Sequence, residues 1–307
     1  MRIAFLGTPE FALPILQALI DRKETIAVFT QPDRPVGRKA VLTPPPVKLL
    51  AQEHDIPVFQ FERIRSAEGV QALKDYAPDL MITAAFGQLL SAENLSIPKY
   101  GTINVHGSLL PKYRGASPIQ SAILNGETVT GVTTMFTDTG MDTGDMLLKQ
   151  EIAISISDTY ESLSEKLSNA GAALLLQTLK QFEEGTLQRT PQDAAQATIC
   201  HLIRKEDGKL EFSDTCLQVH NRVRAMNPWP TATALFDGQT MKIWETRLTD
   251  KTDTVLPVGT LTVDANRLYV QCADGFLEIV SLQAPGKKRM DATSFLHGCS
   301  LAGKRLL

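Results

Sequence analysis

A short stretch in the first half of the chain places an amide and an imidazole two residues apart. Residues 102–106 read TINVH and end at Gly107, a pattern that predicts a short β-strand. Because side chains alternate along a strand, Asn104 and His106 should point to the same face. Both side chains can donate a hydrogen bond to a carbonyl oxygen that gains charge during nucleophilic attack. The pair also fits a structural histidine beside a turn-capping amide, so the spacing alone leaves both interpretations open.

A second polar loop lies further along the chain. Residues 137–145 read TDTGMDTGD and separate two stretches, 131–136 and 146–154, that we predict to be paired strands. The aspartates lack the spacing and the closing glutamate of a calcium-binding EF-hand. We therefore expect no metal site in this loop, and we expect Asp138 and Asp145 to form turns or caps.

The first hundred residues predict the sheet that would position these groups. Short apolar runs at residues 2–7, 26–30 and 80–85 are typical of buried parallel strands, and predicted helices separate them. We therefore predict an α/β fold with a Rossmann-like, mostly parallel sheet, in which ligands bind at the carboxyl edge. The opening lacks the G-x-G-x-x-G motif, and Thr8-Pro9-Glu10 leaves little room for a pyrophosphate. No NAD is therefore expected.

A long segment after the second predicted strand is rich in proline and positive charge. Residues 31–43 carry Arg34, Arg38 and Lys39, and we predict a polar loop without regular structure. Such a loop is either a solvated basic surface or a functional element, and composition alone does not separate the two.

The second half of the chain changes in texture. A helix is predicted over residues 160–184, and the polar stretch that follows is typical of a linker. Short strands and turns then predict a smaller all-β domain of the size of an OB-like barrel. We accordingly divide the chain into a catalytic domain at 1–188, a linker at 189–204 and a C-terminal domain at 205–307.

Composition excludes several classes of protein. The chain has 307 residues, of which 43% are hydrophobic and 21% charged, and its net charge of −3 gives no global basic field. Four cysteines without a C-x-x-C pair argue against zinc and fit reduced thiols in a cytoplasmic protein. We see no signal peptide and no membrane-spanning run, so we expect neither secretion nor a membrane partner.

A modest excess of positive charge lies in the C-terminal part. From residue 201 onward the chain contains 14 Lys and Arg residues and 12 Asp and Glu residues. Lys287, Lys288 and Arg289 form a cluster whose sign suits phosphate groups, although an ordinary solvated surface would look the same.

Two longer strings carry a resemblance to a known family. HGSLLPKYRGASPIQ at residues 106–120 and MDTGD at residues 141–145 resemble the signatures of the folate-dependent formyltransferases, and most closely those of the methionyl-tRNA formyltransferases. The resemblance spans nearly the whole chain, including the C-terminal domain. It implies transfer of a formyl group from 10-formyltetrahydrofolate to the α-amine of methionine on initiator tRNA, at the start of translation.

The resemblance also implies roles for individual residues. Asn104, His106 and Asp142 would be catalytic, with the Asp142 carboxylate facing His106. A carboxylate favours the protonated ring and can accept a proton from the attacking amine, directly or through a water. No metal is needed for this chemistry.

The folate and tRNA contacts follow from the same resemblance. The residues expected to line the folate pocket are Phe86, Gly87, Gln88, Leu89, Leu90, Ser108, Leu109, Leu110 and Pro111, with the loop at 137–142 closing around them. The residues expected to contact tRNA are Arg34, Arg38, Lys39, Lys287, Lys288 and Arg289. We expect the protein to act as a monomer.

Three alternatives remain open at this point. A formyltransferase acting on a sugar-nucleotide amine or on glycinamide ribonucleotide would share the catalytic residues. A nucleic-acid-binding module without catalysis would use only the C-terminal barrel, although an aromatic content of 6% offers few stacking platforms. An NAD-dependent dehydrogenase is disfavoured by the missing glycine motif.

Overall fold

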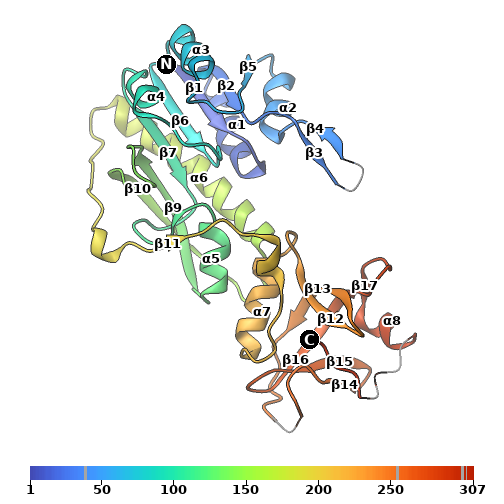
Figure 1. Ribbon diagram of the computed structural model, residues 1–307. Helices are drawn as coiled ribbons and strands as arrows, with labels where there is room; N and C mark the ends of the chain where they lie inside the picture. The colour runs from blue at the N-terminus through green and yellow to red at the C-terminus, as the bar shows by residue number, and fades with distance from the viewer. Residues whose placement is uncertain (38–39, 254–255, 299–300, 302) are drawn as a thin grey trace. The chain divides into compact units, whose positions relative to one another are not determined.

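The chain forms two compact units in a computed structural model (Figure 1), which describes residues 1–37, 40–253, 256–298, 301 and 303–307. Arg38, Lys39 and Cys299 therefore lie outside the described residues. The first unit comprises Met1–Pro118, Val129–Ala153 and Ser164–His201, and the second comprises Ile119–Thr128, Ile154–Leu163 and Leu202–Leu307.

A seven-stranded sheet forms the centre of the first unit, in the order β10-β9-β7-β6-β1-β2-β5. Five of these strands run parallel, whereas β9 is antiparallel to β7 and β10 is antiparallel to β9. The strands are β1 (Arg2–Gly7), β2 (Thr25–Thr30), β5 (Val58–Gln60), β6 (Leu80–Ala84), β7 (Thr102–His106), β9 (Val129–Phe136) and β10 (Met146–Ala153). The predicted Rossmann-like sheet is thus confirmed.

Helices cover this sheet because its central strands are apolar on both faces. Every residue of β6 is buried, as are five of the six residues of β1, so neither face can remain in water. The helical segments are η1 (Glu10–Ala12), α1 (Leu13–Asp21), α2 (Pro46–Glu53), α3 (Ala67–Tyr76), α4 (Ala92–Ser96), α6 (Tyr160–Glu183) and η2 (Ala194–Gln196). Helix α6 approaches the sheet closely at Gly171, where a Cβ atom would lie 2.8 Å from Val105 Cγ1.

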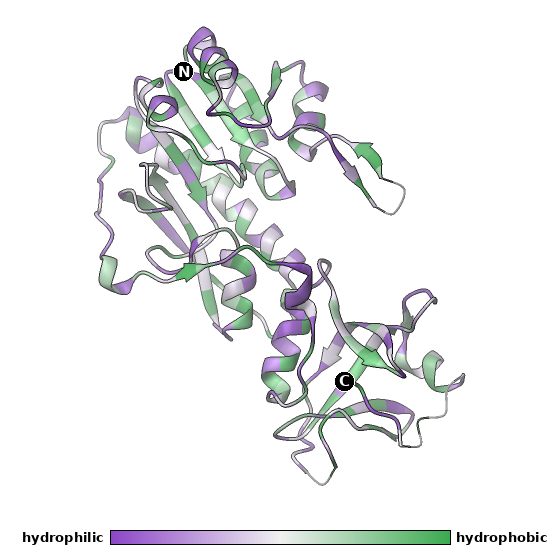
Figure 2. Cartoon of the chain, viewed as in Figure 1, coloured by the Kyte–Doolittle hydropathy of each residue, from purple (hydrophilic) through white to green (hydrophobic). Residues whose placement is uncertain are grey.

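The basic segment after β2 is not the irregular loop that we predicted. Strands β3 (Arg34–Val36) and β4 (Val41–Thr43) pair in an antiparallel hairpin. Local sequence explains the difference, because β-branched Val36 and Val41 lie opposite each other and Gly37 adopts a positive φ of 72°. Figure 2 shows apolar residues in this hairpin, and Leu42 is 65% exposed.

The second unit is built on a six-stranded antiparallel sheet. Its strands are β12 (Ala232–Phe236), β13 (Gln239–Arg247), β14 (Leu261–Asp264), β15 (Arg267–Gln271), β16 (Phe276–Gln283) and β17 (Met290–Asp291). The last residues of the chain join the two ends of this sheet, since Leu306 bridges to Phe236 and Arg305 bridges to Thr260. This closure confirms the predicted OB-like barrel.

Short helices complete the second unit. They are α5 (Pro118–Leu124), η3 (Lys205–Gly208), α7 (Cys216–Ala225) and α8 (Ala292–Leu296). Helix α7 begins with a capping box formed by Thr215 and Gln218, and it buries His220. The His220 ring bonds to Thr246 Oγ1 and the Ile156 carbonyl, and burial lowers its pKa. This histidine therefore has a structural role.

Membrane and thiol features can be stated for the described part of the chain. None of its helices combines the length and the apolar character that crossing a bilayer requires. Cys200, Cys216 and Cys272 are not disulfide-bonded.

Candidate active site

The amide of Asn104 is oriented by the neighbouring strand. Thr83 of β6 lies beside Asn104 of β7 in the sheet register, and its Oγ1 donates a hydrogen bond to Asn104 Oδ1 at 2.9 Å. This bond directs the Nδ2 group away from Thr83, and none of the described residues accepts a hydrogen bond from it. Asn104 therefore presents a free donor. No role for Thr83 was predicted from the sequence, although a hydroxyl within the apolar run LMITA could have indicated one.

His106 is buried and held through one ring nitrogen. It is 6% exposed, and its Nε2 lies 2.9 Å from the Tyr113 carbonyl oxygen. Because a carbonyl only accepts, the proton of the neutral ring belongs on Nε2. Nδ1 then carries a lone pair in the neutral ring, and it becomes a donor only when the ring is protonated.

Asp142 lies opposite the free nitrogen of that ring. Its Oδ2 is 3.7 Å from His106 Nδ1 and accepts a hydrogen bond from the Gly115 amide at 2.8 Å. Gly115 is required there, because a Cβ atom would lie 2.3 Å from the Cys200 carbonyl oxygen. The structure thus brings together the imidazole and the acid that the sequence placed 36 positions apart.

Three of the non-glycine residues with a positive φ lie at or beside these groups. Ala85, Tyr113 and Asp142 have φ angles of 45°, 59° and 53°, in the left-handed region that residues other than glycine rarely adopt. Ala85 follows the end of β6, Tyr113 holds the His106 ring, and Asp142 faces it. Such conformations persist where the surrounding structure enforces them, and they concentrate at functional sites.

The predicted folate segment 86–90 is only partly open to a ligand. Phe86 is buried in the core, and its carbonyl accepts bonds from Thr8 Oγ1 and Gln31 Nε2. The Gln88 side chain bonds to the backbone of Ile64 and Phe61. Gly87 and Leu89 are exposed and Leu90 is half-buried. Phe86 and Gln88 therefore brace the segment, and its surface is formed by backbone and apolar side chains.

The second predicted folate segment, 108–111, is braced in a similar way. Ser108 is fully buried and donates to the Lys112 carbonyl at 2.6 Å, and Leu110 is 1% exposed. Thr133 Oγ1 links the two, since it donates to the Ser108 carbonyl and accepts from the Leu110 amide. Leu109 and Pro111 are half-buried.

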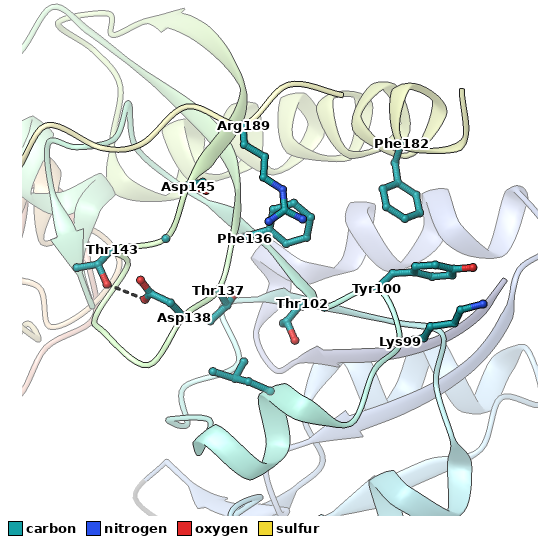
Figure 3. Close-up of a pocket in the computed structure, with 13 residues that line it drawn as sticks. Lys99, Tyr100, Thr102, Phe136, Thr137, Asp138, Thr143, Asp145, Phe182 and Arg189 are labelled. Carbon is teal, nitrogen blue, oxygen red and sulfur yellow. Dashed lines mark hydrogen bonds between the residues drawn. The ribbon is translucent and has the colours of Figure 1, made fainter. Parts of the chain in front are cut away.

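A pocket of about 600 Å³ lies beside the loop that carries Asp142 (Figure 3). Its lining includes Thr102, at the start of β7, and does not include Asn104, His106 or Asp142. The hydroxyls of Thr102 and Thr137 are buried without a partner in the described structure. Phe136 contributes an aromatic wall, with the Arg189 guanidinium 3.9 Å above the ring. Sequence reasoning missed most of these residues, because they come from elements far apart in the chain.

Asp138 forms a turn in this loop, as predicted. Its Oδ1 accepts from the Gly140 amide and from Thr143 Oγ1. No cluster of three or more potential metal ligands occurs within the described ranges.

Comparison with known proteins shows to which family this chain belongs. The model of the formyl transferase family matches residues 1–179, and that of the formyl transferase C-terminal domain matches residues 202–300. The methionyl-tRNA formyltransferase of Pelobacter propionicus is 47% identical over 306 residues, which cover 99% of this chain and 95% of the relative. The enzyme of that name from Acetivibrio thermocellus is 48% identical over 97% of this chain and 96% of the relative.

The chain belongs to the methionyl-tRNA formyltransferase family.

Solved structures with the same fold are more distant. An N-formyltransferase from Helicobacter canadensis is 20% identical with a TM-score of 0.67, covering 94% of this chain and 99% of its own. HypX from Aquifex aeolicus is 18% identical with a TM-score of 0.66, covering 96% of this chain and 47% of its own. At these identities the likeness concerns the fold.

Four of the six basic residues expected to contact tRNA are described by the structure, and all four are exposed. Arg34 pairs with Glu62 at 2.6 Å on the hairpin side of the first unit. Lys287 and Lys288 make no side-chain bond with the described residues, whereas Arg289 lies over the Trp244 ring and donates to Ser281. These side chains are accessible to a large anionic partner.

Proposed function

We propose that the chain transfers the formyl group of 10-formyltetrahydrofolate to the α-amine of methionine on initiator tRNA. The observation that carries this proposal is the convergence of a free Asn104 amide, a His106 ring held by its Nε2, and the Asp142 carboxylate 3.7 Å from Nδ1. The names of similar proteins support methionyl-tRNA as the acceptor, and the folate compounds in the HypX and Helicobacter canadensis structures support a folate-derived formyl donor.

Asn104 stabilises the charge that develops on the formyl oxygen. Its Nδ2 is already turned outward by Thr83, so no reorganisation is needed when the oxygen becomes negative. A protonated His106 is a second donor at Nδ1. The folate donor, when bound, supplies a formyl carbonyl that is already activated.

His106 and Asp142 can accept the proton of the attacking amine and later release it. The neutral ring has its lone pair at Nδ1, and the carboxylate beside it stabilises the ring once it is charged. Either group can take the amine proton, directly or through a water, and return it to the departing nitrogen.

The folate donor would lie at the carboxyl edge of the sheet, where the exposed Gly87 and Leu89 follow the end of β6 and His106 ends the neighbouring strand β7. The pocket beside Thr102 lies at the amino end of β7, and its lining includes none of the predicted folate residues 86–90 and 108–111, so it is not part of the proposed folate site. We propose that residues 1–188 hold this chemistry and that residues 205–307 contact tRNA, in a cytoplasmic monomer.

The most direct experiment supplies a formyl donor and three acceptors to the purified protein. The acceptors are methionyl initiator tRNA, an amino-sugar nucleotide and glycinamide ribonucleotide. Formylation of the methionyl-tRNA alone supports the proposal. Formylation of a small amine in its place would assign the chain to one of the alternative activities.

The Thr83 hydroxyl is expected to matter through Asn104. In Thr83→Val the amide oxygen loses its donor, so Nδ2 is no longer held outward, and kcat should fall about tenfold with KM nearly unchanged. Steady-state kinetics with both substrates measures this effect.

The matched control is Thr83→Ser, which keeps the hydroxyl and should retain most of the activity. If Thr83→Val turns over at the wild-type rate, the orientation of the amide does not depend on this bond.

The positive charge of Arg38 and Lys39, which lie between β3 and β4 in the sequence, is expected to act on tRNA binding. Arg38→Ala combined with Lys39→Ala should raise KM for methionyl-tRNA and lower the slope of log K against log salt by about one per lost phosphate contact. KM for the folate donor should stay unchanged.

A control pair, Lys23→Ala with Lys180→Ala, removes the same charge at the ends of α1 and α6. An equal rise in KM for both pairs would show that only net charge matters. No rise for the Arg38 and Lys39 pair would leave these two residues without a role in binding.

A further inference from the structure

A polar segment at the end of the first unit is bonded to both catalytic loops. Its sequence resembles a linker, yet β11 (Ile199–Cys200) pairs in parallel with β8 (Arg114–Gly115), and Thr190 exchanges two backbone bonds of 2.9 Å with Met146. We call residues 190–200 the strap. At one end the strap bonds to Met146, the first residue of β10 after the loop that carries Asp142. At the other end it pairs with β8, which follows His106 in the chain.

The strap supports the backbone that holds the His106 ring. Thr198 Oγ1 accepts from the Tyr113 amide at 2.8 Å, and the Thr198 carbonyl accepts from the Arg114 amide at 2.9 Å. Tyr113 is the residue whose carbonyl binds His106 Nε2, and it is in a left-handed conformation. The strap therefore fixes the strained residue that sets the position of the ring.

Gln192 touches both loops with one side chain. Its Nε2 donates to the carbonyls of Asp142 and Gly144, each at 2.8 Å, and its Oε1 accepts from Arg114 Nε at 2.9 Å. Both the donor and the acceptor of the amide are thus used. One bond reaches the backbone of the catalytic acid itself, and another reaches the side chain of the residue before Gly115, whose amide binds the same acid.

From these contacts we propose that Gln192 is a positioning residue that sets the distance between the Asp142 carboxylate and the His106 ring; the inference rests on the proposed formyl transfer. Asp142 is in a left-handed conformation, and such conformations persist where neighbouring contacts enforce them. A displacement of about 1 Å at a catalytic group can lower a rate about a hundredfold. The three bonds of Gln192 oppose such a displacement, and none of them engages the Asp142 carboxylate or the His106 ring.

Two substitutions separate the contacts. Gln192→Met keeps the length of the side chain and removes all three hydrogen bonds. Gln192→Glu keeps an acceptor for Arg114 but cannot donate to the carbonyls of Asp142 and Gly144. The matched control is Gln188→Met, because the Gln188 side chain is exposed and bonds only to the Thr186 carbonyl.

Both Gln192 variants should lower kcat about 10- to 100-fold while KM for the folate donor and for methionyl-tRNA stays near wild type. A second readout is independent of activity. Hydrogen exchange of the Gly115 amide, which donates to Asp142 Oδ2, should become faster in the ligand-free Gln192 variants and stay unchanged in Gln188→Met.

The outcomes distinguish this inference from the proposed function. If wild-type protein formylates methionyl-tRNA and Gln192→Glu does so at the same kcat, the positioning role is wrong and the function stands. If both variants lose kcat but Gly115 exchange is unchanged, Gln192 does not act by holding the loops. If wild type transfers no formyl group, the function fails, and exchange at Gly115 still decides whether Gln192 holds Asp142.

Discussion

Replacing Asp142 with asparagine should lower kcat for formyl transfer about 100- to 10,000-fold, because general acid–base groups contribute rate factors of that size. The amide keeps the shape of the side chain and an oxygen that can accept from Gly115. It lacks the negative charge that faces His106 Nδ1 at 3.7 Å. The proton of the amine then has no carboxylate to receive it, and the His106 ring, which can also take it, loses the negative neighbour that stabilises its charged form.

Single-turnover kinetics with saturating substrates measures this loss, and quenching of intrinsic fluorescence by a folate analogue should show that binding survives. Asp138→Asn is the matched control from the same loop. Its amide oxygen can still accept from Gly140 and Thr143, so turnover should stay close to wild type. Near-wild-type turnover of Asp142→Asn would refute the assignment of the catalytic acid.

Truncation of Asn104 to alanine should lower kcat about 100- to 1,000-fold, which is the usual effect of removing one donor to a developing oxyanion. The free Nδ2 group is the part of this side chain that reaches the reacting oxygen, because Oδ1 is occupied by Thr83. KM should change little, since the interaction strengthens only as charge develops.

A double-mutant cycle gives the control. Because Thr83 is expected to act only through Asn104, the variant Asn104→Ala with Thr83→Val should be no slower than Asn104→Ala alone. A further loss in the double variant would mean that Thr83 has a separate role. An Asn104→Ala protein with unchanged kcat would remove the amide from the mechanism.

Local pattern was sufficient for much of the fold. The apolar runs at β1, β2 and β6 were visible because strands buried on both faces must be apolar throughout. Residues 102–106 form the predicted strand β7, in which alternation puts Asn104 and His106 on the same face. The β3–β4 hairpin was not predicted, because prolines and charges dominate residues 31–43. Val36 and Val41, which pair across the hairpin, were the local indication of a strand.

The hydrogen bonds that support Asn104 and Asp142 could not be predicted from the sequence. Thr83 reaches Asn104 across 21 positions, and Gln192 reaches Asp142 across 50, through a segment whose composition is that of a linker. A hydrogen bond between distant residues leaves no periodic trace in either segment. The pocket lining likewise combines α4, β7, α6 and the Asp142 loop, which only the folded chain assembles.

The amino-acid sequence by itself determined the fold class and the family resemblance, because residue types and short spacings carry that information. The spacing on one strand made Asn104 and His106 candidates, and the resemblance added Asp142. The tertiary structure decided which nitrogen of His106 is free, how the Asn104 amide is turned, and what holds Asp142 in place. Those properties depend on the Tyr113 carbonyl, the Thr83 hydroxyl and the Gln192 amide. Direction and distance arise only when separate segments are packed together, because hydrogen bonds act over a few ångströms in space and are indifferent to separation along the chain.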